Sequence, residues 1–120
     1  MSFFKRFFGG TTEAEDRAEA DRLFDANNPF EARMAYEKLR ERKDCSAEAK
    51  AHAGARIHEC LDGLANARIA EAARLISEGQ MELARGELES ACELAKSESI
   101  RKRAARMLDT TEKRDARRAA

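Results

Sequence analysis

Apolar side chains recur every three or four residues along most of this chain, and charged side chains fill the positions between them. This spacing places the apolar side chains on one face of an α-helix. The breaks in the pattern contain asparagine, glycine, proline or serine, which are typical of helix ends and turns. The pattern predicts helices over about residues 12–27, 29–42, 46–64, 66–77, 80–96 and 97–109.

The ends of the first two helices carry specific signals. Thr12 and Glu15 have the spacing of a capping box, in which each side chain accepts a hydrogen bond from the backbone N–H of the other residue. Asn27 is expected to end the first helix, because asparagine tolerates the left-handed conformation of a helix C-terminus. Asn28 and Pro29 then start the second helix as N-cap and first-turn residues. In that helix Phe30, Met34, Ala35, Tyr36 and Leu39 are expected on overlapping faces.

The middle of the chain is ambiguous. Ser46 is expected to cap the third helix, and Gly63 falls inside the apolar pattern. Arg68 occupies the position where the next apolar residue is expected, so the apolar face drifts after Leu64. This drift predicts a break near residues 63–66. Without such a break, residues 47–77 form one long helix.

The composition supports a helical chain throughout. Valine is absent, there is one proline and one tyrosine, and 38% of the 120 residues are charged. The abundant residues are strong helix formers, whereas a sheet needs β-branched and aromatic residues. Short connections between sequential helices favour antiparallel packing. The fold class predicted is all-α, with about five or six helices stacked as antiparallel hairpins over residues 11–109.

One spacing of small and large residues occurs twice. Its positions are separated by 3, 9, 4 and 3 residues, and the two copies begin 52 residues apart. Asn27 and Gly79 occupy the same place in the two sets, at the turn between paired helices. Small residues let the two helices of a hairpin approach closely, and larger residues fill the gaps. The two sets are Ala20, Leu23, Ala32, Tyr36, Leu39 and Ala72, Leu75, Ala84, Leu88, Ala91.

This arrangement resembles the tetratricopeptide repeat, a helix–turn–helix unit of about 34 residues with small and large residues at these offsets. The resemblance covers roughly residues 13–46 and 65–98. The chain departs from the family where Asp44 and Lys96 replace the closing proline, and no tryptophan is present. The resemblance implies a concave surface that receives a peptide or helix of a partner, with Arg17, Asp21 and Arg74 as candidate groove residues. The alternative is a small helical bundle in which the pattern marks only the core.

The first ten residues form a distinct segment that ends in two glycines. On a helix, its four phenylalanines span an arc of about 140°, with the two basic residues on the other side. Such a segment could lie in an anionic membrane interface, insert into a partner's groove, or fold back as a cap on the helices. The candidate binding residues are Phe3, Phe4, Lys5, Arg6, Phe7 and Phe8.

Charge is concentrated at the two ends of a chain whose net charge is zero. Residues 101–120 carry eight basic and three acidic side chains, a net charge of +5, and residues 1–10 carry +2. Residues 11–100 therefore carry −7. Apolar residues stop beyond Asp109, so residues 110–120 are expected to form a basic tail, frayed or as a solvated helix. Nucleic acid is disfavoured as a partner, because the body is acidic and the tail has no aromatic residue for base stacking.

The sequence contains no recognisable catalytic or metal-binding pattern. Cys45, Cys60 and Cys92 are an odd number without close pairing, which argues against a disulfide framework. His52 and His58 diverge on a helix, so we predict no metal, cofactor or enzymatic activity. We expect a cytoplasmic protein–protein interaction module, an adaptor or scaffold. The alternatives are a peripheral adaptor at the inner membrane face, anchored by residues 1–10, and a self-assembling structural protein.

Overall fold

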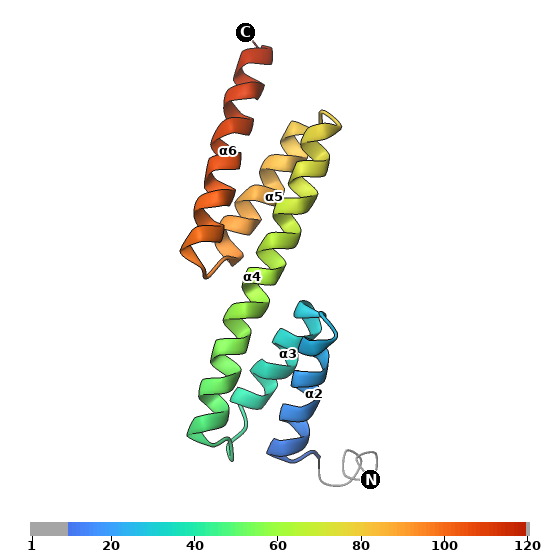
Figure 1. The fold of residues 1–120 in the computed structure, drawn as a ribbon, viewed down its shortest axis with the longest axis vertical. Helices are drawn as coiled ribbons and strands as arrows, with labels where there is room; N and C mark the ends of the chain where they lie inside the picture. The colour runs from blue at the N-terminus through green and yellow to red at the C-terminus, as the bar shows by residue number, and fades with distance from the viewer. Residues whose placement is uncertain (1–9, 120) are drawn as a thin grey trace. The chain divides into compact units, whose positions relative to one another are not determined.

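The computed structural model describes residues 10–119 and contains five α-helices and no strand in that range (Figure 1). The predicted all-α fold class, built from helical hairpins, is confirmed. The helices are α2 (Glu13–Asp25), α3 (Pro29–Arg40), α4 (Ala47–Ser77), α5 (Met81–Leu94) and α6 (Glu98–Ala119).

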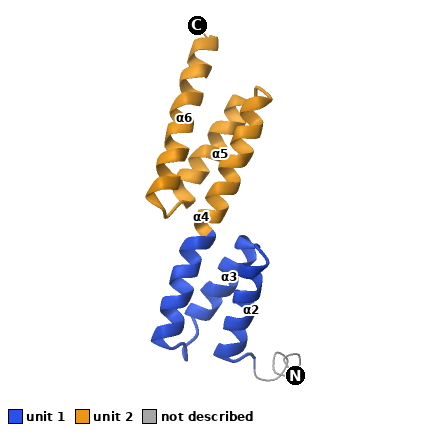
Figure 2. Cartoon of the chain, in the orientation of Figure 1, with its two compact units in different colours: residues 1–60 blue, residues 61–120 orange. Residues whose placement is uncertain are grey.

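The chain divides into two compact units, Met1–Cys60 and Leu61–Ala120 (Figure 2). Unit 1 contains α2, α3 and the first part of α4. Unit 2 contains the rest of α4, together with α5 and α6. Each unit therefore consists of a hairpin and a third helix packed beside it.

Both copies of the repeated spacing lie at the centre of a hairpin. Eight of the ten positions are completely buried, Leu75 is 6% exposed, and Leu23 is half-buried. Alanine at these positions lets the paired helices approach closely, and the large side chain of the second helix fills the space that remains. The eight are Ala20, Ala32, Tyr36, Leu39, Ala72, Ala84, Leu88 and Ala91.

The two hairpins also share one turn geometry. Asn27 and Gly79 have φ values of 60° and 78°, both in the left-handed region. At each turn, the next residue's N–H donates back into the last helical turn, from Asn28 to the Leu23 carbonyl (3.1 Å) and from Gln80 to the Leu75 carbonyl (2.9 Å). This pairing satisfies carbonyls that the helix end leaves without partners. The predicted roles of Asn27 and Gly79 as helix ends are confirmed.

This turn geometry makes Gly79 sensitive to substitution. We expect Gly79→Ala to lower the free energy of unfolding by about 1–2 kcal/mol, because a Cβ is strained at positive φ. Gly86→Ala is the matched control, because Gly86 lies within α5 and an added Cβ would meet nothing within 4 Å. That change should raise stability by about 0.5–1 kcal/mol. Urea denaturation followed by circular dichroism measures both effects, and a neutral Gly79→Ala would contradict the turn assignment.

The helix starts agree only in part with the sequence prediction. The capping box is present, since the Glu15 N–H donates to Thr12 Oγ1 (3.1 Å) and the Thr12 N–H donates to Glu15 Oε1 (3.1 Å). Ser46 caps α4 through a hydrogen bond from the Ala49 N–H (3.1 Å). Asn28 stands at the N-cap position of α3, but its side chain makes no capping hydrogen bond. Pro29 provides the first helical residue there, as expected.

The predicted break near residues 63–66 is wrong, because α4 is continuous from Ala47 to Ser77. Its buried positions follow helical steps up to Cys60, advance by five residues to Ala65, and then follow helical steps again. Each half packs into its own unit, so the drift of the apolar face marks a change of packing partners and not a break. Arg68 is exposed and pairs with Glu87 (3.1 Å). An interior glycine such as Gly63 costs only about 1 kcal/mol, which packing in both units offsets.

The basic C-terminal stretch continues the last helix. α6 extends through residues 110–119. Of the two alternatives predicted for the tail, a frayed end or a helix, the structure therefore shows the helix. Thr111 is buried, and its hydroxyl donates to the Met107 carbonyl (2.8 Å). Asp115 forms an ion pair with Arg85 of α5. These contacts hold the far end of α6 within unit 2.

Candidate interaction surface

Two of the three predicted groove residues connect α2 to α4 within unit 1. The Arg17 guanidinium donates to both carboxylate oxygens of Glu48, at 2.5 and 3.2 Å. Asp21 accepts hydrogen bonds from the Tyr36 hydroxyl and, at 2.8 Å, from His52 Nε2. Both groups therefore have partners inside the unit, and a partner protein would have to compete with those partners.

Asp21 is the centre of a polar cluster at the edge of the unit 1 core. Burial alone would raise the pKa of the Asp21 carboxyl, but the hydrogen bonds from His52 and Tyr36 outweigh it and hold the pKa below its ordinary value. Burial and the hydrogen bond to Asp21 raise the pKa of the Tyr36 phenol. The phenol therefore stays protonated at neutral pH and donates to an ionised carboxylate, which is a strong type of hydrogen bond.

Aromatic contacts hold this cluster in place. The Tyr36 ring packs edge-on against His52 and Phe24, with centroid distances of 5.7 and 6.4 Å. The Arg56 guanidinium lies over the Phe24 ring, 4.2 Å from its centroid. Edge-on aromatic pairs and cation–π contacts each add modest stability beyond burial. The cluster stabilises the packing of α2, α3 and α4 in unit 1.

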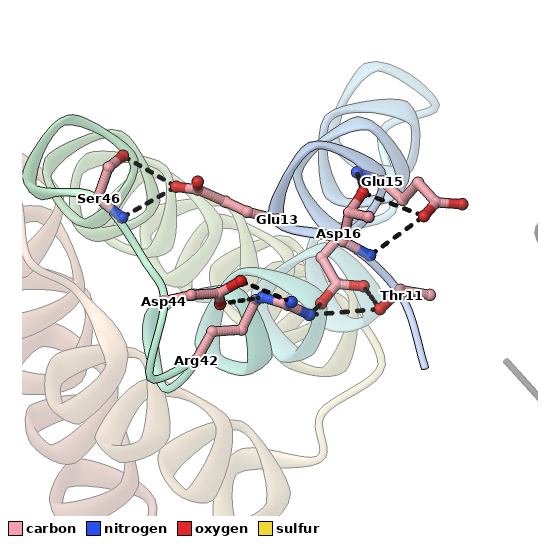
Figure 3. A network of polar contacts seen from close by, with 8 residues as sticks. Thr11, Glu13, Glu15, Asp16, Arg42, Asp44 and Ser46 are labelled. Carbon is pink, nitrogen blue, oxygen red and sulfur yellow. Dashed lines mark hydrogen bonds and ion pairs between the residues drawn. The ribbon is translucent and has the colours of Figure 1, made fainter. Parts of the chain in front are cut away.

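Arg42 organises a second polar network at the other end of α2 (Figure 3). Its guanidinium donates to Asp16 Oδ2 (2.8 Å) and to Asp44 Oδ1 (2.8 Å), and Thr11 donates to Asp16. Burial would raise the pKa of the Asp16 carboxyl, but the hydrogen bonds from Thr11 and Arg42 outweigh it and lower the pKa. The network fixes the loop after α3 to the start of α2.

Both units fix the start of their third helix with an acidic side chain. In unit 1, the Ser46 N–H and hydroxyl donate to Glu13 Oε1 at 3.0 and 2.8 Å (Figure 3). In unit 2, the N–H groups of Lys96 and Ser97 donate to Asp62 Oδ1 at 2.7 and 2.9 Å. Free N–H groups at a helix start attract negative charge, so both contacts are favourable. Both contacts fix the start of a helix, and each uses one oxygen of its carboxylate.

The third predicted groove residue, Arg74, lies in unit 2. Its guanidinium pairs with Glu71 of α4 and, at 2.6 Å, with Glu78 directly after the end of that helix. These are exposed pairs one helical turn apart, which contribute little to stability. The contacts of Arg17 and Asp21 lie in unit 1 and those of Arg74 in unit 2. The other predicted binding residues, Phe3, Phe4, Lys5, Arg6, Phe7 and Phe8, lie outside the described residues.

Three large apolar side chains are exposed in the described part of the chain. Phe30 is 60% exposed, Met34 is 56% exposed and Leu83 is 59% exposed. The expectation that Phe30 and Met34 share overlapping faces with Tyr36 and Leu39 is wrong. Phe30 and Met34 lie one turn apart on α3, roughly opposite Tyr36 and Leu39 at about 100° per residue. The signal was present in the sequence, because two apolar residues four apart are out of register with the buried positions of the same helix.

The described residues offer few groups for catalysis or metal binding. Cys45, Cys60 and Cys92 are all free, and burial raises the pKa of the Cys60 thiol, which is the reverse of what a nucleophilic thiolate needs. Within residues 10–119, no three acidic, histidine or cysteine side chains gather in a way that could hold a metal ion. None of the helices in the same range is long and apolar enough to cross a membrane.

Comparisons of the chain with protein-family models, with curated proteins and with solved structures gave no match. The candidate site therefore depends on the geometry of this chain alone. Its most distinctive element is the pair Phe30 and Met34, which we call the α3 patch.

Proposed function

We propose that this protein is a non-catalytic protein–protein interaction module, an adaptor or scaffold in which helical hairpins present the α3 patch to another protein. The observation that carries the proposal is the exposure of Phe30 and Met34, at 60% and 56%, one turn apart on a helix whose other face is buried. Single exposed apolar residues are common on protein surfaces, but an adjacent aromatic and methionine pair is typical of binding surfaces.

Burial of the α3 patch by a partner protein would contribute enough free energy for the patch to anchor an interface. Covering a half-exposed Phe or Met side chain contributes about 1–2 kcal/mol each. The two together could supply the centre of a small interface, where aromatic and methionine side chains are enriched. The resemblance to tetratricopeptide repeats favours an interaction module in general, because stacked helical hairpins in that family present surfaces to peptides. The groove residues that the resemblance implies lie on α2 and α4, so the choice of the α3 patch depends on its exposure alone.

We expect the double substitution Phe30→Ala/Met34→Ala to lower recovery of a bound partner at least tenfold, which corresponds to about 1.4 kcal/mol. The measurement is capture of proteins from a lysate of the host cell by purified full-length protein, quantified by mass spectrometry. Because both side chains are exposed, the double variant should keep the thermal stability of the unchanged protein.

Leu83→Ala provides the matched control for this capture. Leu83 is 59% exposed on α5 but has no exposed large apolar neighbour among the described residues. We expect this variant to retain the same partner. Equal recovery by the double variant and the unchanged protein would contradict the proposal, as would loss of the partner in the Leu83→Ala variant alone.

A further inference from the structure

Five arginines of α6 have guanidinium groups without an ion pair or hydrogen bond to any described residue, and all five are exposed: Arg103, Arg106, Arg114, Arg117 and Arg118. Two other basic groups of the same helix are paired, Lys113 with Asp109 (3.1 Å) and Arg101 with Glu98 (3.0 Å). Four of the five unpaired arginines share one face of the helix, and we call these four, Arg103, Arg106, Arg114 and Arg117, the arginine stripe.

The arginine stripe lies on one face of α6. With Thr110 between them, its members follow steps of 3, 4, 4 and 3 residues. At about 100° per residue they fall within an arc of about 80°. From Arg103 to Arg117 the stripe is about 21 Å long, at a rise of about 1.5 Å per residue. On a helical wheel, Asp109, Glu112 and Asp115 fall outside this arc.

A hollow with an apolar floor adjoins the stripe within unit 2. Its volume is about 260 Å³, and it lies between the end of α4 and α6. Ile76 and Met107 are partly buried apolar residues in its lining, and Arg106 and Arg114 of the stripe line it as well. Thr110 and Thr111 complete the lining, and both hydroxyls donate to carbonyls of their own helix. The lining hydroxyls are therefore satisfied, and the groups left to a ligand are apolar or cationic.

We infer that the arginine stripe and this hollow bind an acidic amphipathic helix of a partner protein, whose carboxylates pair with the arginines while an apolar side chain enters the hollow. The inference rests on the proposed function, because it names the partner chemistry of an interaction module. On a partner helix that lies along α6, side chains three and four residues apart share one face, and this spacing matches that of the stripe. Arginine can pair with a carboxylate through two parallel hydrogen bonds, which add geometric specificity to the electrostatic attraction.

Nucleic acid fits this surface less well. The stripe contains no aromatic side chain on which a base could stack, and a phosphate backbone offers nothing to an apolar floor. Unit 2 also carries acidic side chains on other faces of the same helix, including Glu98 and Glu112. A carboxylate-bearing helix with an apolar anchor uses both the charge and the hollow.

The test uses full-length protein and a labelled synthetic helical peptide as the probe. The peptide carries glutamates at steps of 3, 4, 4 and 3 residues, with leucines on the adjoining face. We expect it to bind at least tenfold more tightly than a scrambled peptide of the same composition. Replacing its leucines by glutamine should weaken binding about tenfold, and added salt should weaken it further.

Charge reversal assigns this binding to the stripe. We expect Arg106→Glu/Arg114→Glu to weaken peptide binding at least tenfold. Lys43→Glu/Lys50→Glu makes the same change in net charge at exposed positions of unit 1 and should retain binding. Circular dichroism melts check that both variants fold. Equal binding of the scrambled peptide, or unchanged binding by the stripe variant, would overturn the inference.

Further outcomes distinguish a partner helix from nucleic acid and from a second copy of this chain. Tighter binding of a DNA or RNA oligonucleotide than of the peptide would overturn the inference in favour of nucleic acid. Self-association in sedimentation experiments that the stripe variant abolishes would identify the occupant as a second copy, which would also overturn it. If the stripe variant fails to bind the peptide yet captures lysate partners through the α3 patch, the inference and the proposed function are both supported. If peptide binding is absent while patch-dependent capture persists, only the inference fails.

Discussion

Replacing Tyr36 by alanine is expected to lower the free energy of unfolding of unit 1 by about 3–5 kcal/mol, the range for removing a buried aromatic side chain. Tyr36 is completely buried and is among the largest fully buried side chains of the described residues. Its ring contacts Phe24 and His52, and its hydroxyl donates to Asp21. The substitution leaves a cavity and removes the hydrogen bond together.

Native-state hydrogen exchange measures this effect unit by unit. We expect amides of α2 and α3 to lose protection in the Tyr36→Ala variant, while amides of α5 and α6 keep theirs, because each unit has its own core. Tyr36→Phe is the control, since it keeps the ring and removes only the hydroxyl, at a cost of about 1 kcal/mol. A loss below about 1 kcal/mol in Tyr36→Ala, or an equal loss of protection in α5 and α6, would contradict the assignment of Tyr36 to a separate unit 1 core.

Replacing Asp21 by alanine should lower the free energy of unfolding at neutral pH by about 1–3 kcal/mol, because the buried Tyr36 hydroxyl and the His52 ring lose their acceptor. Asp21→Asn should cost less, since an amide oxygen can still accept. Adding Tyr36→Phe to the Asp21→Ala variant should recover part of the loss, because it removes the unsatisfied donor. Urea denaturation of the three variants gives these differences.

The pH dependence of this effect follows from the lowered pKa of Asp21. A carboxyl with a lowered pKa stabilises the folded state fully above its ordinary pKa of about 4 and loses that contribution as pH falls through the folded value. The stability difference between the unchanged protein and Asp21→Ala should therefore be larger at neutral pH than in acid, and should shrink below about pH 4. A difference that grows as the solution is acidified would contradict the assignment.

Local chemistry made much of the fold predictable from the sequence. The capping box at Thr12 and the left-handed positions at Asn27 and Gly79 depend on neighbours in the chain, so their residue types identify them. The repeated spacing predicted the hairpin core positions, because small and large residues alternate where two helices touch. These signals require no knowledge of distant contacts.

Most of the wrong predictions concern features that depend on contacts between residues far apart in the chain. The continuity of α4 across Gly63 depends on packing in two units, which a single helical face cannot reveal. The exposure of Phe30 and Met34 was the exception, because their spacing is out of register with Tyr36 and Leu39 of the same helix and could have been recognised in the sequence. The candidate groove residue Arg17 was chosen as a surface side chain, but its partner Glu48 lies 31 residues away. Which arginines of α6 stay unpaired depends likewise on contacts such as Arg85 with Asp115.

Site-specific photo-crosslinking tests most directly whether the α3 patch contacts another protein. A photoreactive amino acid is placed at Met34 of the full-length protein, and the control carries it at Leu83, which has nearly the same exposure. After irradiation in the host cell, mass spectrometry identifies the crosslinked proteins. We expect a discrete partner joined to position 34 and absent at position 83. The same proteins at both positions, or none at position 34, would contradict the proposal.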